Sequence, residues 1–237
     1  MNSHKINALD DIRAILRRYE RVAEAGCGSV SLGDPAIDGS LPWNGLPRAF
    51  LHEFEHRPGD GAATGFIAGL LSRLMGTDGA ALWCHVSDDI KDGVPYGPSL
   101  ARFGVSTERL IFVRAREKTE LLWAMEECLR SHRFAAVIGE GAVPDLTATR
   151  RLQLAAETGA TTALLSLPHR AGRISAAETR WRVTSLPSDQ PDFPQWHVML
   201  ERCRGGGTGI WHTEWDHEAL RLRVLAALAD RPVATAE

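Results

Sequence analysis

Residues 56–66, which read HRPGDGAATGF, decide the fold of this chain. They follow an extended apolar run, AFLHEFE (49–55), and precede a helical one, FIAGLLSRLMG (66–76). A strand, a glycine-containing loop and a helix start form the setting in which backbone amides and the helix dipole hold phosphate. The stretch therefore predicts a βα unit, and it raises the question of whether the loop binds a nucleotide.

The side chains of this loop argue against nucleotide hydrolysis. A working phosphate-binding loop reads GxxxxGK followed by Ser or Thr, where the lysine neutralises the β- and γ-phosphates and the hydroxyl holds Mg²⁺. With Gly61 as the second glycine of that motif, His56 stands at the first glycine. Ala62 then stands at the lysine and Ala63 at the hydroxyl. The two groups that the chemistry needs are missing.

Three other residues of the loop complete this interpretation. Asp60 places a carboxylate where polyphosphate would lie, which opposes binding of an anion. Thr64 comes one residue too late to hold Mg²⁺ unless the loop is shifted. Gly59, like the glycine at 61, keeps the turn that the chain needs between strand and helix. We expect a vestigial phosphate-binding loop, with no catalytic residue and no cofactor.

Apolar runs and helical runs alternate along the middle of the chain. The runs typical of strands are AFLHEF (49–54), AALWCHV (80–86), RLIFVR (109–114), FAAVIG (134–139) and TTALLSL (161–167). The runs typical of helices are FIAGLLSRLM (66–75), TELLWAMEECLRS (119–131) and TATRRLQLAAE (147–157). This alternation predicts an α/β fold with a mostly parallel central sheet flanked by helices.

After Pro168 the pattern changes. TRWRVTSL (179–186), QWHVMLERC (195–203) and GIWHTEW (209–215) are typical of strands, and the segments between them leave no room for a crossover helix. We therefore expect antiparallel strands added at the C-terminal edge of the sheet. Residues 217–229 fit either a strand or a helix, because apolar alternation gives way to an alanine-rich end.

The chain divides into four predicted parts: an N-terminal amphipathic helix (1–25), an irregular connector (26–47), a core with its antiparallel extension (48–215), and a C-terminal segment and tail (216–237). The N-terminal helix carries an apolar stripe formed by Leu9, Ile12, Leu16 and Tyr19. This stripe either contacts a partner protein or folds back on the core of its own chain.

Composition limits the classes of function. The chain has 237 residues, a formal net charge of −3 and 44% hydrophobic residues, which fits one globular domain with a sizeable core. The near-neutral balance gives no overall field that would hold nucleic acid or an anionic membrane. The four cysteines form no CxxC pair, and no run resembles a signal peptide or reaches the roughly 18–20 apolar residues of a membrane span. We expect a cytoplasmic protein without membrane contact.

Basic residues gather on two short segments, PHRAGRISAAETR (168–180) and RCRGGG (202–207). The candidates for contact with DNA phosphate are His169, Arg170, Arg173, Arg202 and Arg204. The alternative is a solvated rim in which the glycines turn a hairpin. A metal site is not expected, because strand alternation puts His212 and Glu214 on one face and His217 on the other.

Longer stretches resemble a known family. GLPRAFLHEFEHRPGDGAATGF (45–66) is similar to the RecA segment that contains its phosphate-binding loop, and similar stretches follow in order at 96–114, 119–140 and 161–170. The resemblance is closer to the ImuA family of RecA-like inducible mutagenesis proteins, through LWAMEECLRS (122–131), TRRLQLAAE (149–157), PQWHVMLERCRGGG (194–207) and WHTEW (211–215). The RecA-type match covers residues 45–204 and implies a RecA-type core.

The resemblance also implies where the working residues of RecA would fall. The aspartate that helps to position Mg²⁺ falls at Gly139, with Glu140 beside it. The glutamate that activates water falls at or near Val86, and the glutamine that senses the γ-phosphate falls at Pro168. With the lysine position also changed, four parts of one mechanism are replaced together.

The resemblance implies a non-catalytic accessory protein of SOS-induced translesion DNA synthesis. Its implied partners are RecA and/or the Y-family-like protein ImuB, together with an error-prone polymerase, so that its work would be associated with the nucleoid. Two alternatives stay open. One is a cell-division inhibitor of the SulA type that binds FtsZ, and the other is a nucleotide-binding RecA-like ATPase.

Overall fold

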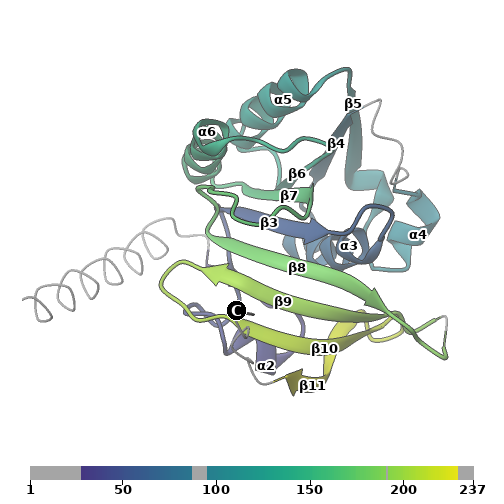
Figure 1. Ribbon diagram of the computed structural model, residues 1–237. Helices are drawn as coiled ribbons and strands as arrows, with labels where there is room; N and C mark the ends of the chain where they lie inside the picture. Colours follow the sequence, from purple (N-terminus) through teal and green to yellow (C-terminus); the bar gives the residue numbers. More distant parts are fainter. Residues whose placement is uncertain (1–27, 87–94, 191, 229–237) are drawn as a thin grey trace, which may run out of the picture.

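A nine-stranded sheet forms the centre of the protein (Figure 1). The computed structural model describes residues 28–86, 95–190 and 192–228. In these residues the strand order is β11-β10-β9-β8-β3-β7-β6-β4-β5. The strands are β3 (Leu51–His56), β4 (Ala81–Val86), β5 (Leu110–Ala115), β6 (Ala136–Glu140), β7 (Thr162–Pro168), β8 (Thr179–Leu186), β9 (Gln195–Cys203), β10 (Gly209–Asp216) and β11 (Arg221–Leu228).

Helices cover both faces of the parallel part of this sheet. Strands β3, β7, β6, β4 and β5 run parallel, as the alternation of apolar and helical runs predicts. Helix α3 (Ala62–Met75) packs on one face, against a cluster that includes Phe54 and Trp83. Helices α5 (Lys118–Arg130) and α6 (Leu146–Thr158) pack on the other. The predicted α/β class, with its mostly parallel sheet, is confirmed.

The C-terminal strands extend the sheet beyond β3. Strands β8 to β11 pair with one another in antiparallel fashion, which confirms the predicted addition at one edge. One detail of the prediction is wrong, because β8 runs parallel to β3. Residues 169–178 carry the chain from the end of β7 back to the start of β8 without a helix. The ambiguous C-terminal segment contributes β11, a strand.

Residues 28–47 pack against the core. This segment contains three short elements: β1 (Ser29–Val30), α2 (Pro35–Asp38) and β2 (Leu46–Pro47). Two other short elements, α4 (Gly97–Ala101) and the 3-10 turn η2 (Thr107–Arg109), lie between β4 and β5. Strands β1 and β2 form a separate two-stranded sheet. Five apolar side chains of this segment are buried in the cluster beneath α3: Val30, Leu32, Ile37, Leu41 and Leu46. The predicted irregular connector is therefore ordered here, because these spaced apolar residues anchor a Gly- and Pro-rich chain.

Tryptophans join the antiparallel extension to α3. Trp181, Trp196, Trp211 and Trp215 are all buried. Gly69 of α3 makes room for Trp215, because a Cβ atom there would lie 2.6 Å from the Trp215 ring. The aromatic side chains thus pack the added strands against α3.

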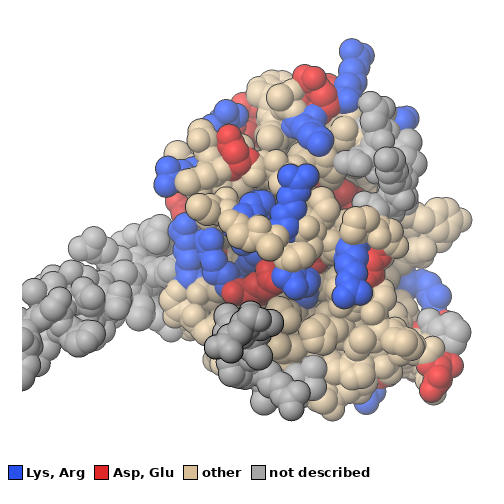
Figure 2. Space-filling model, viewed as in Figure 1, with Lys and Arg blue, Asp and Glu red and all other residues tan. Residues whose placement is uncertain are grey.

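The surface mixes charges of both signs. On the face seen in Figure 2, Lys and Arg side chains gather across the middle, with Asp and Glu side chains between them. Among the described helices, none is long and apolar enough to cross a membrane. The predicted N-terminal helix, with Leu9, Ile12, Leu16 and Tyr19, lies outside the described residues.

Candidate functional site

The loop between β3 and α3 has the predicted strand–turn–helix geometry. β3 ends at His56, and the amide of Asp60 donates to the carbonyl of Arg57 (3.0 Å) to close a turn. Gly59 adopts a φ of 76°, a left-handed conformation that favours glycine. Gly61 caps α3, which begins at Ala62. The amide groups at the start of α3 therefore point toward the space above the loop, as they do in a phosphate site.

The Asp60 carboxylate lies at this helix start. Its Oδ1 accepts a hydrogen bond from the amide of Ala62 (3.0 Å) and another from the Ser185 hydroxyl (2.6 Å). Its Oδ2 accepts one from the amide of Ser185 (3.0 Å). Burial alone would raise the pKa of Asp60, but the hydrogen bonds from Ser185 and Ala62 lower it below its usual range. An ionised side chain thus occupies donors that a bound anion would need.

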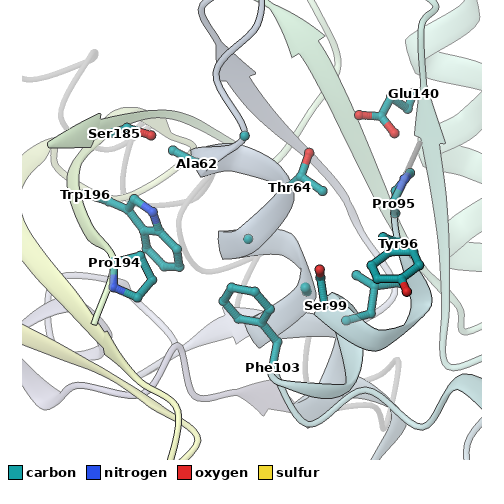
Figure 3. A pocket seen from close by; sticks show the side chains of 14 residues that line it. Ala62, Thr64, Pro95, Tyr96, Ser99, Phe103, Glu140, Ser185, Pro194 and Trp196 are labelled. Atoms are coloured by element: carbon teal, nitrogen blue, oxygen red, sulfur yellow. The ribbon is translucent and has the colours of Figure 1, made fainter. Parts of the chain in front are cut away.

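A pocket of about 350 Å³ opens beside this loop (Figure 3). One wall is the first two turns of α3, including Ala62 and Thr64. Figure 3 shows Trp196 and Tyr96 on opposite sides of the start of α3, with Phe103 below. The pocket therefore lies where a strand–loop–helix nucleotide site would hold its ligand, and its walls are mainly apolar.

The positions implied for the other RecA working residues lie at the carboxyl ends of neighbouring strands. Val86 ends β4, Pro168 ends β7, and Gly139 is the penultimate residue of β6. A Cβ atom at Gly139 would lie 2.2 Å from the sulfur of Met125, so this position faces α5. Glu140 faces the other way, lines the pocket and accepts a hydrogen bond from the Trp83 indole (3.1 Å). Of these positions, Glu140 alone places a carboxylate at the pocket.

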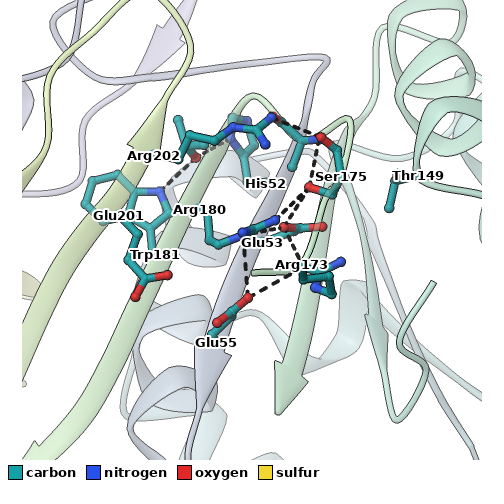
Figure 4. A network of polar contacts seen from close by, with 12 residues as sticks. His52, Glu53, Glu55, Thr149, Arg173, Ser175, Arg180, Trp181, Glu201 and Arg202 are labelled. Carbon is teal, nitrogen blue, oxygen red and sulfur yellow. Dashed lines mark hydrogen bonds and ion pairs between the residues drawn. The ribbon is translucent and has the colours of Figure 1, made fainter. Parts of the chain in front are cut away.

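A buried network of charges lies on the opposite face of β3 (Figure 4). Glu53 and Glu55 are fully buried beneath residues 169–178. The Oε2 atom of Glu53 lies 2.6 Å from the Arg173 guanidinium and 3.0 Å from that of Arg180. Ser175 donates its hydroxyl to the same oxygen (3.0 Å). Two buried carboxylates are therefore neutralised by two arginines from the β7–β8 crossover and β8.

This network uses most of the residues predicted to contact DNA. Arg173 is nine-tenths buried against Glu53. The Nδ1 atom of His169 lies 2.5 Å from Glu55, and Arg202 donates to the carbonyl oxygens of Ser175 and Ala177 at 3.1 and 2.8 Å. The two other predicted residues differ, since Arg170 is exposed and Arg204 is half-buried.

One histidine and two glutamates meet at one point of this face. Glu55, His169 and Glu201 each offer an atom within 4.8 Å of the others, which is close enough to hold a metal ion. Arg173 and Arg180 already lie 3.6 and 3.5 Å from Glu55, and another arginine pairs with Glu201. Positive charge is therefore supplied by the protein itself, which opposes binding of a cation.

The histidines near the C-terminus have hydrogen-bond partners. His212 and Glu214 both contact Gln195, at 3.0 and 3.2 Å. The Nδ1 atom of His217 lies 2.8 Å from the carbonyl oxygen of Arg102. His217 lies beyond the end of β10 and contacts a different part of the chain from His212.

Two curated relatives place the chain in a family. The ImuA proteins of two strains of Caulobacter vibrioides are each 38% identical to it over 235 residues, which cover 88% of this chain and 93% of the relative. The chain belongs to the ImuA family. A shorter match links this ImuA-family chain to the cell division inhibitor SulA of Edwardsiella piscicida, with 38% identity over 80 residues, 33% of this chain and 46% of the relative. No family model matches the chain.

Several residues of the site escaped sequence reasoning. The sequence did not predict that residues between Pro95 and Phe103 line a pocket. Tyr96, one of these residues, is 68% exposed. Glu53 and Glu55 alternate with apolar residues, a pattern typical of a half-exposed strand. Two features of the sequence could have pointed to these residues. One is the presence of Tyr96 and Phe103 in a glycine- and proline-containing stretch, and the other is the surplus of arginine between residues 170 and 182.

Proposed function

We propose that this ImuA-family chain is a non-catalytic, RecA-like accessory protein of SOS-induced translesion DNA synthesis, and that it acts by binding proteins. Membership of the family supports the role in inducible mutagenesis that the family name describes. The observation that carries the non-catalytic part is the Asp60 carboxylate at the start of α3, hydrogen-bonded to Ala62 and Ser185.

The charge of Asp60 opposes nucleotide binding in two ways. It takes the amide of Ala62, one of the donors that a β-phosphate would use. It also sets a negative charge against negative phosphate oxygens, while Ala62 supplies no compensating ammonium. The buried Ala63 adds no hydroxyl for Mg²⁺. We infer that the protein keeps the fold of a nucleotide-binding protein but does not bind a nucleotide.

Calorimetry with ATP and Mg²⁺ tests this inference. The wild-type chain is expected to give no binding heat at micromolar to millimolar ATP. A double variant, Asp60→Ala with Ala62→Lys, removes the carboxylate and supplies an ammonium, and it should bind ATP more tightly than the wild type. Micromolar affinity of the wild-type chain would overturn the proposal in favour of a nucleotide-binding ATPase.

We propose RecA and/or ImuB as the protein partners, in a complex with an error-prone polymerase. Two surfaces support contact with proteins. One is the apolar stripe of residues 9–19, and the other is the edge of the sheet at β5. In the described part of the chain β5 pairs only with β4, and its side chains Ile111 and Phe112 are 50% and 40% exposed. Exposed apolar side chains on an unpaired strand edge are typical of a binding surface.

A pull-down from DNA-damaged cells distinguishes the two surfaces. Leu16→Asp and Tyr19→Asp change the stripe, and Phe112→Lys changes the edge of β5. Loss of RecA or ImuB from one set of variants assigns the contact to that surface, with Leu154→Asp as a control at an exposed position of α6. Recovery of both partners by every variant, at the wild-type level, would contradict the assignment of either surface.

Weak contact with single-stranded DNA is a further part of the proposal. It now rests on Arg170 and Arg204, since Arg173 and Arg202 are engaged inside the protein. Arg170 is exposed on the crossover between β7 and β8, and the amide of Arg204 donates to the carbonyl of Glu178 at the end of that crossover (3.0 Å). The contact would be electrostatic and independent of base sequence.

The partial match to SulA favours one other function. A SulA-type inhibitor binds FtsZ, and 33% of this chain aligns with such a protein. The test is FtsZ polymerisation followed by light scattering with and without the purified chain. Unchanged polymerisation is expected, and stoichiometric inhibition would replace the proposed role.

A further inference from the structure

Two histidines stand side by side on the outer face of the antiparallel extension. His197 of β9 lies directly opposite His212 of β10, two strands that Figure 1 shows next to each other. Their sequence neighbours Trp196, Val198 and Trp211 are buried in the cluster beneath α3, so both imidazoles lie on the other face of the sheet. Opposed residues on one face carry Cβ atoms about 4.5–5.5 Å apart. At this spacing two imidazoles can share one metal ion.

Hydrogen bonds define the tautomer of His212. The amide nitrogen of Gln195 donates to the Glu214 carboxylate (3.2 Å), which leaves the amide oxygen of Gln195 as an acceptor. That oxygen lies 3.0 Å from Nε2 of His212, so Nε2 carries the proton. The lone pair of the neutral ring is then on Nδ1. Metal-binding histidines have the same arrangement, in which the second ring nitrogen donates to an acceptor that orients the ring.

His197 is held in the form that binds metals. Burial lowers the pKa of this histidine below its usual value, and the nearby His212 and Arg182 lower it further. The ring is therefore neutral at pH 7, with a lone pair on one nitrogen. No hydrogen bond joins the ring to another residue in the described ranges of the chain. A metal ion would thus replace no protein contact of His197.

The arginines of this face have acidic partners. Arg182 would oppose a cation near His197, but it forms an ion pair with Glu201. Arg223, on β11, lies 3.9 Å from Asp216. The cluster at Glu55 differs, because arginines there contact the carboxylates that would themselves be the ligands. Here the two ligand atoms belong to neutral imidazoles.

We propose that His197 and His212 bind one divalent transition-metal ion of the Zn²⁺ class, through Nδ1 of His212 and a ring nitrogen of His197. Imidazole suits Zn²⁺, Cu²⁺ and Ni²⁺, whereas Mg²⁺ and Ca²⁺ prefer oxygen ligands. Gln195 is a positioning residue that orients His212, and Glu214 orients Gln195 in turn. The remaining coordination positions of the ion face away from the core.

This site is separate from the pocket beside α3 and does not rest on the proposed function. The expectation of no metal site compared His212 with His217, which follows it closely in the sequence. His197 lies on another strand, and only the register of β9 with β10 brings it beside His212. The pair is therefore a property of the folded sheet rather than a sequence motif.

Calorimetric titration of the full chain with ZnCl₂ tests the site. The wild type should bind Zn²⁺ with micromolar affinity, and MgCl₂ should give no binding. His197→Asn and His212→Asn should each weaken the binding of Zn²⁺ by about tenfold or more, because one imidazole cannot chelate. Two controls should keep the wild-type affinity. His132→Asn changes an exposed histidine, and His169→Asn changes the cluster at Glu55.

Nitrogen NMR of the wild-type chain gives a readout that needs no variant to fold. In ¹H–¹⁵N spectra of the histidine side chains, Zn²⁺ should shift Nδ1 of His212 and leave Nε2 protonated. Gln195→Ala should weaken the binding of Zn²⁺ by about tenfold, because the ring loses its orienting acceptor. Gln195→Glu keeps an acceptor for Nε2 and should bind at least as tightly as the wild type.

Four results would overturn the inference. They are no saturable binding of Zn²⁺ by the wild type up to millimolar concentration, wild-type affinity in His197→Asn or His212→Asn, loss of binding in His169→Asn, and an unshifted Nδ1 of His212 at saturation. Loss of binding in His169→Asn would place the ion at the Glu55 cluster instead. The proposed accessory role fails on wild-type ATP affinity, so the two failures are separable.

Discussion

The guanidinium of Arg173 lies 2.6 Å from the carboxylate of Glu53, which is fully buried in the middle of the sheet. The contact joins the helix-free crossover between β7 and β8 to the strand that it passes over. Arg180 reaches the same oxygen at 3.0 Å from the start of β8. Ion pairs thus hold the crossover on the sheet, whereas residues 28–47 pack on the core through apolar side chains.

Loss of Arg173 should destabilise the protein. Removing one partner of a buried ion pair costs about 3–5 kcal/mol, and we expect about 3 kcal/mol for Arg173→Ala, because Arg180 still faces Glu53. Urea unfolding measures the change. The exposed Arg170→Ala, three residues away, should change stability by less than about 0.5 kcal/mol. Equal stability of the two variants would show that the network is not structural.

Acid should destabilise the fold through His52. Burial lowers the pKa of this histidine to about 3, although its contact with the carbonyl oxygen of Pro47 acts in the opposite direction. The pKa of histidine in the unfolded chain is about 6.5, so below this pH the unfolded chain binds a proton at His52 and the folded chain does not. This contribution to stability is therefore complete above pH 6.5 and is lost as the pH falls toward 3.

The pH dependence can be isolated with one variant. The His52 contribution should approach about 1.4 kcal/mol per pH unit between pH 6 and pH 4. His52→Gln lowers stability at pH 7 but removes this slope, so its unfolding free energy should fall less steeply with acid than that of the wild type. Parallel curves for the two proteins would contradict the assignment.

Gly69→Ala should reverse the usual effect of alanine in a helix. Replacing a glycine inside a helix ordinarily stabilises it by up to about 1 kcal/mol. Here the new methyl group would meet the buried Trp215 ring at 2.6 Å, and overpacking costs about 1–3 kcal/mol. Thermal unfolding should therefore show a lower Tm. Gly207→Ala, where a Cβ atom meets nothing within 4 Å, is the control.

Binding to single-stranded DNA should depend on salt and on two arginines. Fluorescence anisotropy with labelled oligo-dT measures the affinity over a series of salt concentrations. If Arg170 and Arg204 each contact one phosphate, changing both to Gln should lower the salt slope by about 1.4. An unchanged slope, or no binding by the wild type, would remove DNA from the proposed function.

Local sequence patterns predicted the main helices and strands. The features that they did not predict depend on contacts between residues far apart in the sequence. The βα alternation and the loop at 56–64 follow from residue order, so the parallel sheet could be predicted. The direction of β8 could not, because it depends on how residues 169–178 cross the sheet. Glu53 likewise reads as a solvent-facing residue until Arg180, its partner 127 residues later, is placed beside it.

The candidate pocket shows the same division. The absence of a lysine at Ala62 was visible in the sequence, as was the carboxylate of Asp60. The role of Asp60 as a hydrogen-bond acceptor for Ser185 was not, since 125 residues separate the two. The sequence alone shows that the phosphate-binding loop has lost its lysine, whereas the stacking of Phe103 on Trp196 in the pocket could not be predicted from it.

The central position of β3 sets a condition on how the chain acquires its fold during synthesis. Its two neighbours, β7 and β8, come from much later in the sequence, and His52 meets Thr179 across 127 residues. During synthesis one edge of β3 stays unpaired until β7, which ends at Pro168, has emerged from the ribosome, and the other until β8, which ends at Leu186, has emerged. Such distant pairing slows folding and exposes strand edges meanwhile. We expect the nascent chain to need chaperone protection over most of its translation.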